Sequence, residues 1–179
     1  MLRDRIETEH LVLRKAQEED LPAIWHNVWR DGELARMMLW KPTESREAAV
    51  VRMERTMAYQ KENHAYFVCL KQNDEPIGFA GITETGAGEF EETGICIAQD
   101  WQNRGFGKEV LLALVRLAFD TLGGHGFRYG CFHENLASAA LCKGCGFTYS
   151  HSKEQIREWD GYAYRCDYYT LERDADTIG

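Results

Sequence analysis

The spacing of apolar positions changes repeatedly along this 179-residue chain, and each change predicts a new element. Residues 10–15 alternate, with Leu11 and Leu13 on one face, and therefore predict a strand. The acidic turn 18–20 favours a helix start, because carboxylates stabilise the positive end of a helix. Residues 33–38 predict a second, short helix. The apolar stripe expected on the first helix consists of Ile24, Trp25, Val28 and Trp29.

A longer helix and three strands follow. Ser45 is a favourable N-cap for a helix that extends to about Asn63. Its buried side is expected to carry Val50, Met53, Met57 and Ala58. Apolar runs then predict strands at 66–70, 76–82 and 92–97, of which the first two form a hairpin.

The second half of the chain alternates helical and extended patterns. The helix after Gly105 ends at the glycine-rich segment 123–126. Its expected buried stripe is Val110, Leu111, Leu114, Val115 and Ala118. The remaining elements are a strand at 127–132, a helix at 137–143 and strands at 148–158 and 162–171. The acidic end, 172–179, predicts a frayed tail.

These elements predict one α/β domain over residues 1–179. Its sheet should be mixed and mostly antiparallel, with about seven strands flanked by about four helices. The order is β, α, α, β, β, β, α, β, α, β, β, and the sequence contains neither an internal repeat nor an interdomain linker.

Charge and hydropathy narrow the function. Lysine and arginine number 21 against 29 acidic residues, a net charge of −8, whereas nucleic-acid binders carry a basic face. The acidic balance favours cationic partners such as amines. Apolar runs fall short of the roughly 18 residues that a membrane helix needs, and the N-terminus lacks a signal-peptide core. We therefore expect a cytoplasmic protein that binds neither nucleic acid nor membrane.

The six cysteines do not predict a metal or redox site. Cys142 and Cys145 form a Cys-x-x-Cys pair on a short helix, where a thioredoxin-like context is missing. A zinc site would need two further ligands, with Cys131 and His133 nearest in sequence. Inside predicted strands, small apolar side chains are expected to be buried, and this applies to Cys69, Cys96 and Cys131.

The loop 102–108 carries the strongest functional signal. It joins the strand ending at Ile97 to a long helix, so unpaired N–H groups and the positive end of the helix dipole meet there. This arrangement suits a phosphate or pyrophosphate. A dinucleotide fingerprint would need glycine at Val110, and a P-loop would need Ser or Thr at Glu109, so both alternatives fail on spacing.

A second motif follows about 30 residues later. Gln102-x-x-Gly105-x-Gly107 is followed by Asn135-Leu136-Ala137-Ser138, then Leu141 and Gly146-Phe147. In this order, the motifs resemble the acyl-coenzyme A site of the GNAT N-acetyltransferase superfamily, and the resemblance covers nearly the whole chain. The segments Glu7–Arg14 and Glu19–Leu21, with Leu39-Trp40, are similar to the RimJ/RimL-like branch, which acetylates the N-termini of ribosomal proteins.

The resemblance implies acetyl-CoA as cosubstrate. The residues implied to contact it are Ile95, Cys96, Ile97, Gln102, Asn103, Arg104, Gly105, Phe106, Gly107, Lys108, Asn135, Ser138 and Cys142. The strand backbone at 95–97 would pair with the pantetheine amides. Arg104 and Lys108 are otherwise solvated cations, and Asn135 is as well suited to cap the following helix.

Acetyl transfer needs a neutral amine, a polarised thioester and a proton for the departing thiolate. Many relatives place a tyrosine after the leucine of the second motif, but Cys142 stands there, and Gly144 replaces a frequent lysine. Ser138 is therefore our candidate donor to the sulfur, the alternative being a contact with backbone only. Glu92 is our candidate base and acceptor-site residue, and the alternative is a solvated acid among its neighbours.

Trp40 is the aromatic residue expected to contact the acceptor, and His133 is a second candidate base. We therefore predict direct acetyl transfer in a ternary complex to a primary amine, either a protein or peptide N-terminus or a small molecule. The alternative is a catalytically weakened CoA-binding module for sensing or interaction. The sequence leaves the acceptor open, and also the choice between monomer and homodimer.

Overall fold

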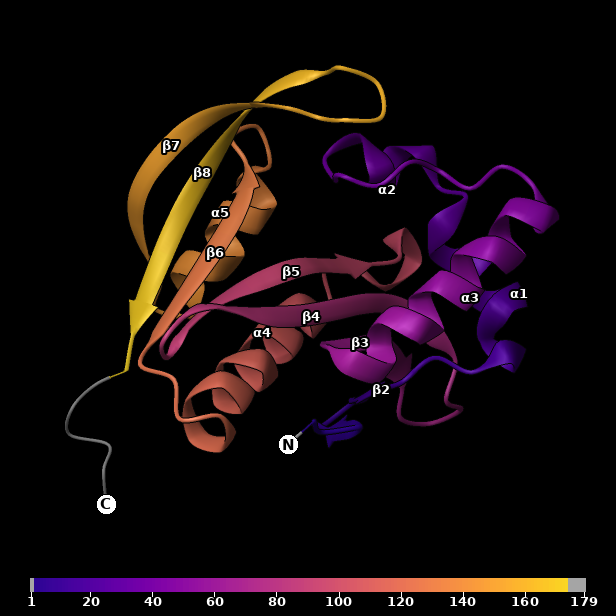
Figure 1. The fold of residues 1–179 in the computed structure, drawn as a ribbon, viewed down its shortest axis with the longest axis horizontal. Helices are drawn as coiled ribbons and strands as arrows, with labels where there is room; N and C mark the ends of the chain where they lie inside the picture. Colours follow the sequence, from indigo (N-terminus) through magenta and orange to yellow (C-terminus); the bar gives the residue numbers. More distant parts are fainter. Residues whose placement is uncertain (1, 174–179) are drawn as a thin grey trace.

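Eight strands form one sheet in the computed structural model, which describes residues 2–173 (Figure 1). In chain order they are β1 (Arg5–Glu7), β2 (Leu11–Arg14), β3 (His64–Leu70), β4 (Pro76–Gly86), β5 (Glu89–Ile97), β6 (Gly126–Phe132), β7 (Thr148–Ile156) and β8 (Ala163–Glu172). Across the sheet the order is β1-β2-β3-β4-β5-β6-β8-β7, with one parallel pair, β5 and β6, in the described chain. The predicted mixed, mostly antiparallel α/β fold is confirmed. The additional strand β1 has only three residues, too few to give a periodic signal.

The helices are α1 (Leu21–Ile24), α2 (Gly32–Arg36), α3 (Arg46–Glu62), α4 (Phe106–Arg116) and α5 (Leu136–Gly144). A 3₁₀ turn at Glu18–Asp20 precedes α1, and π-helical turns extend α1 to Trp29 and α4 to Thr121. The predicted tail begins later than expected, because Glu172 pairs with Gly126 in the sheet. The rest of that tail, 174–179, lies outside the described residues.

The buried face of α3 differs from the prediction. Ser45 caps the helix as expected, accepting a hydrogen bond from the Ala48 N–H at 3.1 Å. Val50, however, is 40% exposed, and Ala58 is exposed as well. The residues that α3 buries are Ala49, Met53 and Gln60. A buried glutamine cannot be predicted from hydropathy; Gln60 is held there because its side-chain oxygen accepts from the Ala16 N–H at 2.6 Å.

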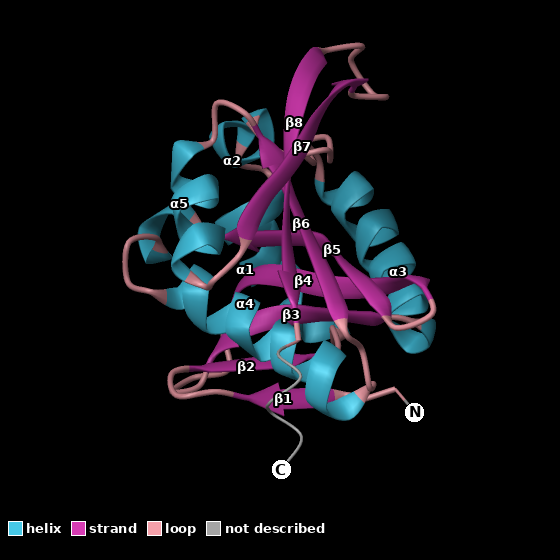
Figure 2. Ribbon diagram, turned by 90° about the vertical axis from the view of Figure 1, so that its left-hand side faces the viewer, coloured by secondary structure: helices cyan, strands magenta, loops and turns pink. Residues whose placement is uncertain are grey.

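The sheet has helices on both faces (Figure 2). In β3, Tyr66 and Val68 belong to the core beneath α4, while Phe67 and Cys69 belong to the core beneath α1 and α3. Such alternation follows from the two-residue period of a strand. All members of the predicted α4 stripe are buried: Val110, Leu111, Leu114, Val115 and Ala118.

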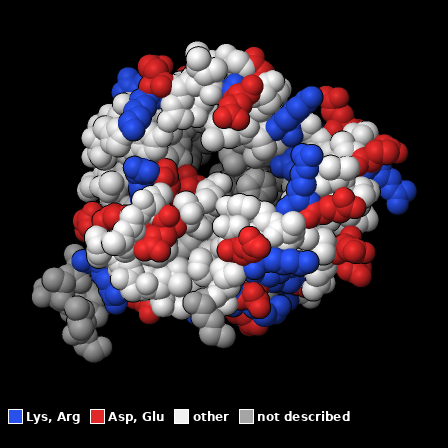
Figure 3. Space-filling model, viewed as in Figure 1, with Lys and Arg blue, Asp and Glu red and all other residues white. Residues whose placement is uncertain are grey.

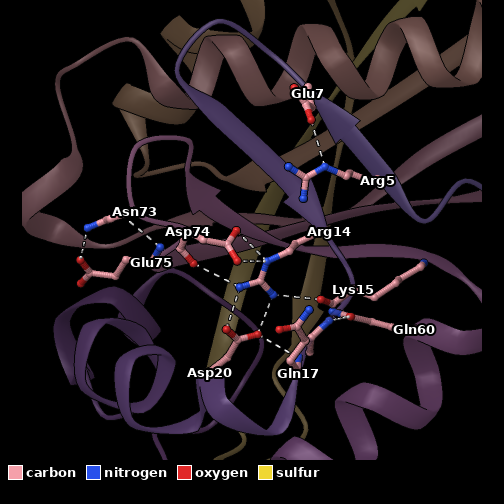
Figure 4. A network of polar contacts seen from close by, with 11 residues as sticks. Arg5, Glu7, Arg14, Lys15, Gln17, Asp20, Gln60, Asn73, Asp74 and Glu75 are labelled. Carbon is pink, nitrogen blue, oxygen red and sulfur yellow. Dashed lines mark hydrogen bonds and ion pairs between the residues drawn. The ribbon is translucent and has the colours of Figure 1, made fainter.

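An arginine network fixes the N-terminal segments (Figure 4). The Arg14 guanidinium at the end of β2 donates to both carboxylate oxygens of Asp20, at 2.7 and 2.8 Å, and to Asp74 at 2.9 Å. The paired carboxylates raise the pKa of Arg14. The contact between Arg14 and Asp20 thereby joins the segments Glu7–Arg14 and Glu19–Leu21 at the turn before α1.

The two parallel strands separate soon after they meet. β5 and β6 pair only from Glu89 with Gly126 to Glu91 with Arg128, and Figure 1 shows them fanning apart beyond this point. The cause lies in β5, which bulges against β4 beside Gly94, at a φ of +124° that favours glycine. The bulge bends β5 away and opens a gap in the sheet.

Candidate active site

A cavity of about 600 Å³ occupies the gap between β5, α5 and the loop before α4. We call it the groove. Residues of α2 and the two positions that follow it, Met37 and Met38, form its far wall. The structure brings most of the predicted cosubstrate residues to its lining: Ile95, Cys96, Ile97, Gln102, Asn103, Gly105, Phe106, Gly107, Lys108, Asn135 and Ser138.

The N-terminus of α4 points uncapped N–H groups at the groove. Side chains cap α2, α3 and α5, but within residues 2–173 none caps α4. Its N-cap is Gly105, which has a φ of +81° and no side chain to bind the first-turn amides. Lys108 adds a positive charge at the same place. Free amides, a helix dipole and a cation together fit a pyrophosphate.

The edge of β5 that faces the gap is polar. The Ala98 N–H donates to Ile77 in β4 at 2.7 Å, whereas the Ile97 carbonyl points the other way and accepts from Gln102 Nε2 at 2.9 Å. Because backbone groups alternate along a strand, those of Ile95 face the gap too. They are free to pair with an extended amide chain, and Gln102 holds the end of the strand in place.

Gly107 lines the groove and also lies against α5. A Cβ there would lie 2.5 Å from Leu141 Cδ1, so the glycine lets α4 and α5 pack closely. A Cβ at Gly105 would meet open space, and that residue is constrained by its positive φ.

Ser138 forms a hydroxyl pair with a residue that the sequence did not single out. Its Oγ lies 2.6 Å from Tyr129 Oη, with either group able to donate. Its N–H donates to Asn135 Oδ1 at 3.1 Å, so Asn135 caps α5 while it lines the groove. Burial raises the pKa of Tyr129, so the phenol stays protonated. Alternation in β6 could have placed Tyr129 toward α5, but nothing in the sequence pairs it with Ser138.

Glu92 lines a second cavity, of about 260 Å³, which we call the inner cavity. Its carboxylate accepts from the Gly94 N–H and, at 3.4 Å, from the Gly130 N–H. Burial raises the pKa of Glu92 to about 7. The neighbouring Glu91 is instead paired with Arg128. Among the acids of β5, Glu92 thus combines a partly desolvated carboxyl with a cavity, which is typical of a general base.

The groove and the inner cavity share lining residues. They are Met37, Met38, Ile95, Tyr129, Asn135 and Ser138. The hydroxyl pair therefore stands at the junction, with the open α4 N-terminus on one side and Glu92 on the other.

Residues 10–148 match the family model described as acetyltransferase (GNAT) domain. The chain belongs to this family. An acetyltransferase of the GNAT family from Bacillus anthracis has a similar structure, with a TM-score of 0.80, 18% identity and coverage of 94% of this chain and 98% of that one. The ribosomal-protein-S5-alanine acetyltransferase of Vibrio fischeri has a similar structure, with a TM-score of 0.74 and 18% identity. That match covers 97% of this chain and 98% of that one. Such identities establish the fold alone. Among curated proteins, none matches this chain.

The chain is therefore an acyl-CoA-dependent N-acetyltransferase, and its family uses acetyl-CoA as cosubstrate. In residues 2–173, helices are too short or too polar to cross a bilayer. The lining of its groove fits that cosubstrate, because uncapped amides lie at one end and the free edge of β5 runs along it.

Three candidate residues line neither the groove nor the inner cavity. Arg104 stacks on Trp101, with 4.6 Å from Cζ to the ring centroid, and donates to Asp100 O at 3.1 Å. Cys142 is fully buried, its thiol donates to the Ala139 carbonyl, and burial raises its pKa to about 11. His133 is exposed and pairs with Asp167 at 2.8 Å.

Trp40 lines the inner cavity, where its indole packs edge-on against Phe79 with centroids 6.3 Å apart. Its buried Nε1 has no hydrogen-bond partner among the described residues. The predicted acceptor-site tryptophan and the predicted base thus line one cavity.

One arginine holds the end of α2 and the residues after it, which form the roof of the acetyltransferase site. Arg157, in the turn between β7 and β8, donates from Nη1 to the carbonyls of Ala35, Arg36 and Met38, at 3.2, 3.0 and 3.1 Å. Its Nη2 donates to Asp160 at 2.6 Å. The hairpin thereby fixes the end of α2 above the hollow at the centre of the molecule (Figure 3).

Proposed function

We propose that this acetyltransferase moves the acetyl group of acetyl-CoA directly to a primary amine while both are bound. The observation that carries the proposal is the junction of the two cavities. The Tyr129–Ser138 pair stands there, the uncapped start of α4 lies along the groove, and Glu92 lines the inner cavity.

Different groups bind the cosubstrate, donate to the sulfur and accept the amine proton. Bound acetyl-CoA would supply a thioester, held by the amides at 105–108 and by the free edge of Ile95. Ser138, backed by Tyr129, is placed to donate a hydrogen bond to the sulfur as negative charge develops there. Glu92 is placed to accept a proton from the amine, directly or through one water.

The Tyr129 hydroxyl could replace the tyrosine that many relatives carry after the leucine of the second motif, where it would protonate the departing thiolate. Cys142 replaces it in sequence, but a phenol reaches the same junction from β6. This supports a working enzyme over a CoA-binding module that has lost its acid. The proposed acceptors are protein or peptide N-termini, as in the RimJ/RimL-like branch, and small amines. A cytoplasmic location and a homodimer stay predictions.

The test is thiol release from acetyl-CoA by the purified protein, with peptides that begin with Ala or Ser and with small alkylamines as acceptors. Product mass must rise by one acetyl group. The Glu92→Gln variant is the matched control, since it keeps the shape of the site but not the carboxylate. Binding of acetyl-CoA without turnover on any amine would support the CoA-binding module instead.

A further inference from the structure

A third cavity of about 510 Å³, which we call the outer cavity, adjoins the inner cavity. Five residues line both: Leu39, Trp40, Phe79, Thr93 and Gly94. The outer cavity is otherwise formed by α3, β3 and the π-helical turn that ends at Trp29. An acceptor whose amine reaches Glu92 therefore has room to extend toward α3.

Arg52 is the distinctive residue of the outer cavity. Its guanidinium carbon lies 4.7 Å from the ring centroid of Trp29 and 4.9 Å from that of Trp40, so the two indoles hold its plane. Its Nη1 donates to Thr43 Oγ1 at 3.0 Å and to Lys41 O at 3.3 Å. Burial lowers the pKa of Arg52 to about 10, so the group remains charged at neutral pH.

No carboxylate of residues 2–173 pairs with this half-buried guanidinium, in contrast to the two buried arginines. Arg14 is paired with Asp20, and Arg157 with Asp160. Keeping a partly buried cation without a counter-ion is costly, and a planar guanidinium is well suited to two parallel hydrogen bonds from a carboxylate. Since Nη1 is already occupied by protein acceptors, the other donors of Arg52 are available to a ligand.

The two adjoining cavities differ in charge, with basic side chains around the outer one and the Glu92 carboxyl in the inner one. Arg55, one helical turn after Arg52 on α3, also lines the outer cavity, while Glu92 lines the inner one. The neighbouring Glu91 is paired with Arg128. Figure 3 shows the central hollow with basic side chains on its α3 side and, on the opposite side, an acidic side chain with a basic one beside it. Such a field suits a molecule that is positive at one end and negative at the other.

We propose that the natural acceptor is a primary amine that also carries a carboxylate, with the carboxylate bound by Arg52 and the amine directed to Glu92. This inference rests on the proposed function, because it names the acceptor class of the same site. It covers free amino acids and peptides with an acidic side chain near the N-terminus, since both present the same two groups.

The test compares matched acceptors. β-Alanine, 4-aminobutyrate and 6-aminohexanoate are each paired with their primary amide. The dipeptide Ala-Asp is paired with Ala-Asn, both with an amidated C-terminus, so that only the side-chain carboxylate differs. Rates are corrected for the fraction of neutral amine. In at least one pair, kcat/KM for the acid should exceed that for the amide by about 10- to 100-fold. The chain length of the preferred acid reports the distance between the site of its carboxylate at Arg52 and the site of its amine at Glu92.

Three variants assign the preference to Arg52. Arg52→Gln should abolish it, and Arg52→Lys should retain part of it, because lysine keeps the charge without the planar fork. Arg46→Gln, which removes an exposed arginine of the same helix outside the cavities, should leave it intact. Affinity for acetyl-CoA, measured alongside, shows that each variant is folded. The acid-to-amide ratio is the readout, because a merely structural role of Arg52 would lower both rates together.

Equal rates on acids and amides by the wild type would overturn the inference and leave the proposed function standing. A preference that survives in Arg52→Gln would also overturn it. If Arg52→Gln does not fold, an undiminished preference in Arg52→Lys would count against the inference. Absence of turnover on every amine would refute the proposed function, and the inference with it.

Discussion

The side-chain oxygens of Tyr129 and Ser138 lie 2.6 Å apart at the point where the groove meets the inner cavity. One comes from β6 and the other from the first turn of α5, so the contact depends on how the helix packs on the sheet. A hydroxyl whose proton is shared with a buried phenol is oriented before any ligand arrives. Orientation of this kind is what a donor to a developing thiolate needs.

Ser138→Ala should therefore lower turnover by about 10- to 100-fold, and Tyr129→Phe should lower it less, because it removes only the orienting partner. The measurement is steady-state thiol release at saturating acetyl-CoA. Tyr149→Phe is a matched control, since Tyr149 forms a 2.8 Å hydroxyl pair with Ser152 on β7, away from the cavities. Wild-type turnover in Ser138→Ala would remove this residue from the mechanism.

Glu92→Gln should change the pH dependence of the reaction. Burial raises the pKa of Glu92 to about 7, so the fraction of ionised base, and with it kcat, should increase from pH 6 to pH 8. The variant should lose this rising limb and be slowest relative to the wild type near neutral pH. At pH 9 to 10 the defect should fade, because a larger share of a basic alkylamine is already neutral there. Superimposable profiles would show that Glu92 is not the base.

The same variant should reveal what the raised pKa costs in stability. The folded-state pKa of about 7 exceeds the 4.5 of an unperturbed carboxyl, so between these values the folded protein holds a proton that the unfolded chain has released. Stability contributed by Glu92 is thus present below pH 4.5 and lost as pH rises through 7. At pH 8, Glu92→Gln should be more stable than the wild type, by at most about 3 kcal/mol. In urea unfolding, that gain should be much smaller at pH 5 and absent near pH 4.

A charge in the phosphate loop should weaken acetyl-CoA binding. Gly105→Glu adds a carboxylate beside the uncapped amides of α4, and we expect about 10- to 100-fold weaker binding in isothermal titration. Gly123→Glu is the matched control, because Gly123 also has a positive φ, +74°, and open space at its Cβ, but lies outside the groove. Both variants should lose similar stability, so only the affinity separates them. Equal affinities would place the phosphates elsewhere.

Arg157→Met should loosen the roof of the site. The substitution removes three hydrogen bonds to the end of α2 and should cost about 2 kcal/mol of stability. Because Met37 and Met38 line the groove, KM for acetyl-CoA should rise more than kcat falls. Arg157→Lys keeps the charge, so its stability and its KM should lie between those of the wild type and Arg157→Met. An unchanged KM in a destabilised Arg157→Met would restrict this arginine to a role in stability.

Several features of this acetyltransferase follow from local sequence alone. The stripe of α4 obeys a 3.6-residue period, and the N-cap at Ser45 needs only the residues beside it. The loop 102–108 is readable for the same reason, because backbone freedom at Gly105 and the helix start after it are both local. These elements, in their order, also determined the fold class.

Other features depend on residues that meet only after folding. Glu91 and Glu92 are adjacent and chemically alike, yet Arg128, 37 residues away, pairs with the first. The second lies just beyond the last β5–β6 pair, lines the inner cavity and accepts hydrogen bonds from backbone N–H groups only. Desolvation and pairing decide a pKa, and neither is written in the neighbouring sequence. The phenol expected beside Leu141 likewise comes from β6, and Arg52 gains its site from two distant indoles. Periodicity determined the elements, whereas the tertiary contacts alone decided which side chains could do chemistry.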